Sequence, residues 1–100
     1  MSTTQPTPEE VASEIRKLKI LRSRVPRRDS FGTDNRKLIE HQLWVLENDV
    51  TEYDQVEEYV DENGGDQDSA AIALEWKLGL SEDCPSDDWK AIQIKKSTRK

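Results

Sequence analysis

The sequence predicts an all-α fold, in which an antiparallel helical hairpin carries a third, shorter helix packed on it, with disordered termini. Three observations predict this fold. Apolar residues recur at spacings of three and four, which is the period of a helix and not of a strand. No Gly or Pro falls between residues 34 and 62, so nothing there should break a helix. The connection at residues 26–33 is short, which favours antiparallel packing of the two helices it joins.

The first helix has clear start and stop signals. Thr7 can cap it, Pro8 suits the first helical position, and Glu10 completes a capping box. Pro26 should end the helix, because a proline pushes the residue before it, Val25, toward extended geometry. One side of the helix is apolar, through Val11, Ile15, Leu18 and Leu21.

The second helix is expected to run unbroken from Asp34 to Glu62, with Thr33 or Asp34 as its cap. Its seam repeats about every 3.5 residues and misses one slot, where Glu57 stands. At about 1.5 Å per residue this helix would be roughly 40 Å long. The seam residues are Ile39, Leu43, Leu46, Val50, Tyr53 and Val60.

The third helix should follow Asn63-Gly64-Gly65, which is a strong helix stop. Asp66 or Asp68 can cap it, and it should run over residues 69–78. Gly79 suits the position just past its end, where a left-handed backbone is common. This helix is the expected cover for the far half of the long seam.

The chain is expected to form one folded unit. Residues 1–6 should be disordered, residues 7–94 should form a single helical domain, and residues 95–100 should form a basic mobile tail. Within the domain, residues 81–94 fit either a short helix or an extended segment. Their apolar residues, Trp89, Ile92 and Ile94, are too few to decide between the two.

Composition limits the classes of protein to consider. The chain has 100 residues, 33% of them hydrophobic and 36% charged, which suits one small domain with a lean core. The single cysteine, Cys84, leaves no internal disulfide and fits a reducing cytosol. No apolar run approaches the roughly 18 residues of a membrane span, and the N-terminus lacks signal-peptide features. We therefore expect a cytoplasmic protein without a membrane partner.

Charge is distributed unevenly along the chain. The net charge is +4 over residues 1–37, −12 over residues 38–76 and +2 over residues 77–100. Carboxylates spaced along a helix can imitate a nucleic-acid backbone and occupy a basic groove on another protein. A purely solubilising role is the alternative. The predicted binding residues are Glu52, Asp54, Glu57, Glu58, Asp61, Glu62, Asp66 and Asp68.

A basic cluster around the hairpin bend offers a second candidate surface. Such a cluster can contact phosphates, although only Phe31 is nearby for base stacking and the whole chain is acidic. A solvated face, or one paired within the chain, is the simpler interpretation. The residues of this alternative site are Arg22, Arg24, Arg27, Arg28, Arg36 and Lys37.

No catalytic, metal or cofactor site is expected. His41 is the only histidine, and Cys84 lacks a recognisable base. The order of residues 61–68 does not match a calcium-binding EF-hand loop. Homo-oligomerisation is expected instead, because the long helix carries apolar residues off its seam. These are Leu38, Trp44, Val45 and Val56.

One pattern resembles a known family. Phe31-Gly32, Asn35, Ile39, Gln42 and Val45-Leu46 resemble the F-G-x-x-N-x-x-x-I-x-x-Q-x-x-V-L pattern of short, uncharacterised phage and prophage proteins. An acidic stretch, an Ala-rich segment ending in Trp76, and Pro85-Ser86 before Trp89 are also similar, so the resemblance covers residues 28–90. It implies a phage or mobile-element origin and expression in a bacterial host, and no particular activity.

These observations together predict a non-enzymatic interaction protein that binds a host or phage protein through its acidic helix, and the resemblance implies that it is phage-encoded. A protein with a basic surface is the expected partner. The alternative is a nucleic-acid-associated protein that uses the basic first helix and the tail.

Overall fold

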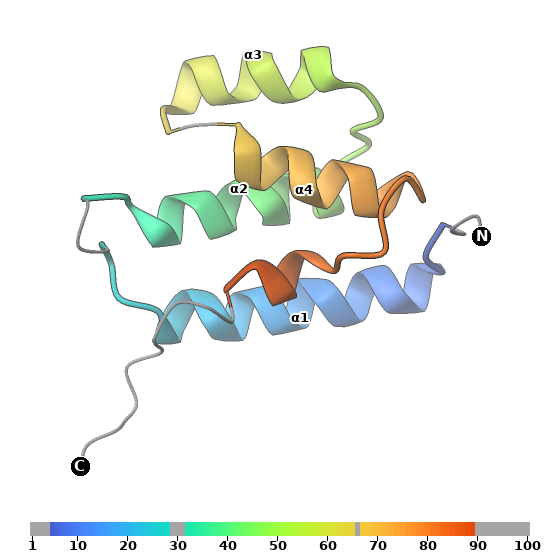
Figure 1. The fold of residues 1–100 in the computed structure, drawn as a ribbon, viewed down its shortest axis with the longest axis horizontal. Coiled ribbons are helices and arrows are strands. Elements are labelled where there is room, and N and C mark those ends of the chain that lie inside the picture. Colours follow the sequence, from blue (N-terminus) through green and yellow to red (C-terminus); the bar gives the residue numbers. More distant parts are fainter. Residues whose placement is uncertain (1–4, 29–31, 66, 90–100) are drawn as a thin grey trace.

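The structure, a computed structural model, describes residues 5–28, 32–65 and 67–89. These residues form α-helices and one short 3-10 helix, and they contain no strand, which confirms the all-α prediction. Figure 1 shows the helices stacked in layers, with α1 and α3 on opposite sides of the molecule. The elements are α1 (Pro8–Arg24), α2 (Asn35–Glu47), α3 (Tyr53–Asn63), α4 (Asp68–Lys77) and the 3-10 helix η1 (Pro85–Trp89).

Helix α1 begins and ends where local chemistry predicts. The Thr7 hydroxyl accepts the Glu10 N–H at 3.1 Å, and the Glu10 carboxylate accepts the Thr7 N–H at 2.9 Å. This reciprocal pair is the expected capping box. At the other end Val25 is extended, with φ −69° and ψ 151°, as a residue before proline should be.

Helices α1 and α2 lie antiparallel, as two ion pairs between them show. Arg22 lies 3.9 Å from Glu40, and Lys19 lies 3.3 Å from Glu47. The C-terminal end of α1 therefore lies beside the N-terminal half of α2. The Asp34 carboxylate caps α2 by accepting the Lys37 N–H at 3.2 Å, as expected. The cations of α1 reach acids of α2 in this way.

The single long helix predicted from Asp34 to Glu62 is wrong, because the chain leaves the helical path after Glu47. Asn48 is extended, with φ −120° and ψ 170°, and its side chain donates to the Trp44 carbonyl at 2.9 Å. Asn side chains compete with helical hydrogen bonds in this way. The turn places Val50 in the core, where it is only 1% exposed.

The end of α2 is stabilised from a distant part of the chain. The Lys77 ammonium donates to the carbonyls of Val45 at 2.9 Å and Asn48 at 2.6 Å. These are carbonyls that a helix end leaves without a partner, and a cation there also interacts favourably with the helix dipole. Burial lowers the pKa of Lys77, and the nearby Asp49 carboxylate partly offsets this.

Helix α2 is the centre of the fold. It packs mainly against α1 and α4, while α3 lies at the outer edge against α4 and is also contacted by side chains of α2 (Figure 1). The apolar residues expected to be exposed and to drive self-association are therefore covered within the chain. Leu38, Val45 and Val56 are buried, and Trp44 is half-buried against Tyr59. The apolar basis for predicting a homo-oligomer is wrong.

Helix α4 forms close to the predicted range. Gly79 has φ +80°, and the N–H groups of Gly79 and Leu80 donate to the Trp76 and Glu75 carbonyls at 3.1 and 2.8 Å. This is a Schellman motif, with the left-handed glycine in the predicted position. The N-cap is Gln67, without a side-chain hydrogen bond, instead of Asp66 or Asp68.

The segment after α4 turns back across α1. Residues 85–89 form η1, so the short-helix alternative holds for this part of residues 81–94. Gln5 lies close to Gly79, since a Cβ at that glycine would be 3.0 Å from the Gln5 backbone nitrogen. The predictions for residues 1–4, and for residues 90–100 with the basic tail, lie outside the described residues.

Candidate interaction surface

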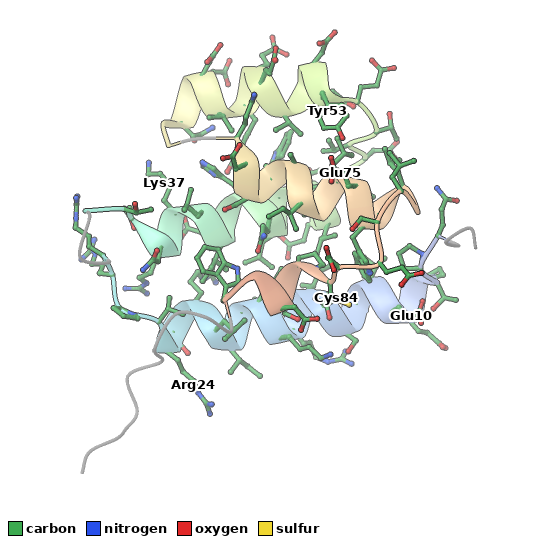
Figure 2. All side chains as sticks on the ribbon, in the orientation of Figure 1. Glu10, Arg24, Lys37, Tyr53, Glu75 and Cys84 are labelled. Atoms are coloured by element: carbon green, nitrogen blue, oxygen red, sulfur yellow. The ribbon has the colours of Figure 1, made fainter. Side chains whose placement is uncertain are left out.

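Five of the predicted acidic residues share one side of α3. At about 100° per residue their side chains fall within an arc of about 140°, opposite the buried Val56 and Val60. All five are exposed, and none makes an ion pair with a described residue. Figure 2 shows oxygen-tipped side chains projecting from the outer edge of α3. We call this the acidic face, and it consists of Asp54, Glu57, Glu58, Asp61 and Glu62.

The other three predicted acids lie elsewhere. Glu52 precedes α3, where its N–H donates to the Gln55 side chain at 3.0 Å. Asp68 opens α4 and has an interaction of its own within the structure. Asp66 lies outside the described residues. Of the eight predicted acidic residues, five therefore share one side of α3.

The beginning of α3 is tied to α4. The Tyr53 hydroxyl donates to Glu75 at 2.7 Å, and Figure 2 shows the two side chains meeting. That hydrogen bond, with smaller contributions from burial and from the Glu75 charge, raises the pKa of Tyr53. The contact fixes the first turn of the helix that carries the acidic face.

The end of α3 is held by two α2 side chains. The Lys37 ammonium donates to the Asn63 carbonyl at 2.6 Å, and His41 Nε2 lies 2.8 Å from the Gly64 carbonyl. Both groups meet carbonyls that a helix end leaves free. The Tyr59 ring stacks on Trp44 with centroids 4.0 Å apart, and His41 meets its edge at 5.1 Å. These contacts hold α3 to the bundle and leave the acidic face unpaired.

Several residues of the alternative basic site make contacts within the chain. Arg22 pairs with Glu40, Lys37 is committed to α3, and Arg28 donates to the Gly32 carbonyl at 3.0 Å. Of the other members, Arg24, Arg27 and Arg36 are exposed. The hollow beside them, of about 290 Å³, is lined by Arg27, Asp34, Arg36, Lys37 and Glu40. Two carboxylates therefore line this hollow, and their negative charge weakens its attraction for phosphate.

His41 has a structural position. It is 1% exposed, its Nε2 lies against the Gly64 carbonyl, and Nδ1 has no hydrogen-bond partner among the described residues. No group of three His, Cys, Asp or Glu in the described part of the chain could hold a metal ion. The burial of His41 and its contact with the Gly64 carbonyl fit a role in packing.

Cys84 is poorly suited to act as a nucleophile. Burial, followed by the nearby carboxylates of Glu14 and Asp87, raises the pKa of its thiol. A higher pKa leaves less thiolate, which is the reactive form. It lines a hollow of about 420 Å³ between the N-terminal segment, α1 and the end of α4.

We expect Cys84 to react with a thiol reagent such as DTNB more slowly than free cysteine at pH 8, because its thiolate fraction is smaller. Denaturation should bring its rate up to that of the free amino acid. The measurement is the absorbance time course with and without guanidinium. A folded-state rate above that of free cysteine would show that the thiol is activated.

Sequence reasoning missed the buried polar groups that organise this fold. Gln42 is completely buried, donates to the Ser69 carbonyl at 3.1 Å and accepts the Trp89 indole N–H at 2.8 Å. Glu14 is also buried and accepts the Ser86 N–H at 3.0 Å. Polar residues inside an apolar stripe were the available signal, since buried polar groups need partners.

The residues that carry the phage-protein pattern are mostly interior. Asn35, Ile39, Gln42 and Val45-Leu46 are all buried along α2, and Asn35 donates to the Pro26 carbonyl at 3.3 Å. Their spacing is that of the buried stripe of α2. Phe31 lies outside the described residues. The pattern therefore describes packing and not a surface site.

No family model, curated protein or solved structure matches this chain. The resemblance to phage and prophage proteins stays a prediction. In the described part of the chain, no helix combines the length and the apolar character needed to cross a membrane.

Proposed function

We propose that this protein is a non-enzymatic interaction module that binds a protein with a basic surface through the acidic face. The observation that carries this proposal is that five exposed carboxylates share one side of α3 with no described cation paired to them. A row of carboxylates along a helix can imitate a charged nucleic-acid backbone, so inhibition of a nucleic-acid-binding protein is one form of this function.

The energetics of α3 support a role in binding. Asp54–Glu58, Glu57–Asp61 and Glu58–Glu62 are like-charge pairs four residues apart, and each costs roughly 0.2–0.5 kcal/mol. A cationic partner relieves this repulsion and gains association rate from electrostatic steering. The repulsion therefore destabilises α3 in the free protein, and a basic partner would reduce it.

The resemblance of residues 28–90 guides the choice of partner source. We propose a phage-encoded protein that acts in the cytoplasm of a bacterial host, so a bacterial lysate is the material to search. The variant to compare with the parent is Asp54→Asn/Glu57→Gln/Glu58→Gln/Asp61→Asn. A matched control removes four exposed carboxylates outside the acidic face, as Glu9→Gln/Asp49→Asn/Glu82→Gln/Asp83→Asn.

The parent and the control should capture the same protein at about 0.1 M salt and lose it at about 1 M, where the screening length falls to about 3 Å. The acidic-face variant should lose it at both. That variant should fold with its stability changed by no more than about 1 kcal/mol, since relieved repulsion is partly offset by loss of Asp54 near the α3 N-terminus. Capture by the acidic-face variant as strong as by the parent would contradict the proposal.

A nucleic-acid-associated function is the second candidate. The exposed Arg24, Arg27 and Arg36 favour it, because they gather where α1 ends and α2 begins. Retention of labelled duplex DNA by the parent, and its loss on Arg24→Gln/Arg27→Gln/Arg36→Gln, would favour this function over the first.

A further inference from the structure

The outward side of α1 is an unpartnered helix face of opposite sign to the acidic face. Arg16, Ile20 and Arg24 stand four residues apart, so they line one side of the helix. Both arginines are exposed and make no ion pair with a described residue. Ile20 is 53% exposed, one of few large apolar side chains so placed in the described chain. We call these three residues the basic face.

The basic face and the acidic face lie on opposite sides of the molecule. Figure 1 shows α1 along one edge and α3 along the other, with α2 and α4 between them. Figure 2 shows Arg24 pointing away from the bundle. Neither face can neutralise the other within one chain. The two faces therefore carry opposite charge on opposite sides of a molecule whose net charge is −6.

The two faces match in length and spacing. Arg16 and Arg24 are eight residues apart on α1, and Asp54 and Glu62 are eight residues apart on α3. Eight residues rise about 12 Å along any α-helix, so two helices laid side by side keep these charges opposite one another.

We propose that the acidic face of one copy binds the basic face of a second copy, so that the chain associates head to tail. This inference rests on the proposed function, since it names a partner for the same acidic face. The contact uses different surfaces on the two copies, so each bound copy keeps one free face and the association is open-ended. Charge complementarity across the two helices selects this partner.

Ionic strength should tune this association. At about 0.1 M salt the screening length is about 10 Å, so repulsion between the distant parts of two acidic molecules is damped while charges in contact still attract. At about 1 M the screening length is about 3 Å, and the contact itself is weakened. Association should therefore be present at the lower salt and absent at the higher.

Two variants that each lack one face give a sharp test by sedimentation velocity. Arg16→Gln/Arg24→Gln removes the charge of the basic face, and Asp54→Asn/Glu57→Gln/Glu58→Gln/Asp61→Asn removes most of the charge of the acidic face. At about 0.1 M salt the apparent mass of the parent should exceed the monomer mass of 11.5 kDa, and it should rise with protein concentration. Each variant alone should be monomeric. An equimolar mixture should form a dimer that grows no further, because one intact face of each kind remains.

Circular dichroism establishes that both variants keep the helical fold, which is expected because every substituted residue is exposed. A monomeric parent together with a mixture that forms no dimer would overturn the inference. Association of either variant alone, to the extent of the parent, would also overturn it by placing the contact elsewhere. If the parent is monomeric while the acidic-face variant still loses a captured bacterial protein, this inference fails and the proposed function stands. If the parent assembles by this contact and captures no other protein, this inference stands, and the expectation of a separate bacterial partner for the acidic face fails.

Discussion

Replacing Leu43 or Leu46 by alanine should destabilise the protein by about 2–5 kcal/mol, the usual range for a buried leucine. Both side chains are buried in α2, at 3% and 5% exposed. Because α2 packs against both α1 and α4, a cavity there loosens the two main helix contacts of the fold. Domains of this size have total stabilities near the lower end of about 5–15 kcal/mol, so much of the fold would be lost.

The measurement is thermal unfolding followed by circular dichroism. A loss of 1 kcal/mol lowers the midpoint by about 4–8 °C in a domain of 60–100 residues, so each variant should melt well below the parent. Ile20→Ala is the matched control, because it truncates a side chain that is 53% exposed and should shift stability by no more than about 0.5 kcal/mol. Parent-like melting of both leucine variants would mean that α2 does not form the core.

The helix ends that local chemistry controls could be predicted from the sequence. Thr7 and Glu10 needed only each other to form the capping box, and Pro26 needed only its own ring to end α1. Gly79 likewise reached its left-handed conformation in the expected position. Signals of this kind act within a few residues, so no tertiary context can hide them.

The break between α2 and α3 was harder to predict, although the sequence carries a trace of it. The buried stripe of α2 extends to Val50 in the turn that follows the helix. In α3 the buried Val60 still falls on the predicted seam, but the buried Val56 does not. Tyr53 and the slot held by Glu57, which would continue the phase, are exposed. Because the missing slot at Glu57 was treated as a minor gap, a single long helix was predicted, and this prediction was wrong. The cation that stabilises the break, Lys77, comes from a distant part of the chain.

The acidic face was predictable because it depends on charge and on helical period, both of which are visible in the sequence. The absence of paired cations along this face, among the described residues, could not be predicted from the sequence. That absence depends on Lys37 and Lys77 donating to backbone carbonyls 26 and 32 residues away, instead of pairing with carboxylates. Long-range hydrogen bonds of this kind need the fold itself. Sequence reasoning accordingly named the residues of the acidic face as part of a longer stretch, and their role in binding stays a prediction.

Replacing Gln42 by leucine should cost about 1–3 kcal/mol, the usual penalty when a buried polar group loses its partner. The Gln42 amide joins α2, α4 and η1, since it donates to the Ser69 carbonyl and accepts the Trp89 indole N–H. Leucine fills a similar volume, so the cost arises mainly from the indole N–H that is left without a partner, and not from a cavity. This N–H is buried along with Trp89, which is 3% exposed.

A double-mutant cycle with Trp89→Phe separates the hydrogen bond from packing. Phenylalanine has no N–H to satisfy, so Gln42→Leu should cost less in its presence, and the double variant should be more stable than the sum of the single effects by about 1–2 kcal/mol. The free energies of unfolding from urea titrations give all four corners of the cycle. Strict additivity would mean that the Gln42–Trp89 hydrogen bond contributes nothing to stability, and that η1 is held to the bundle by Glu14 and by apolar contact alone.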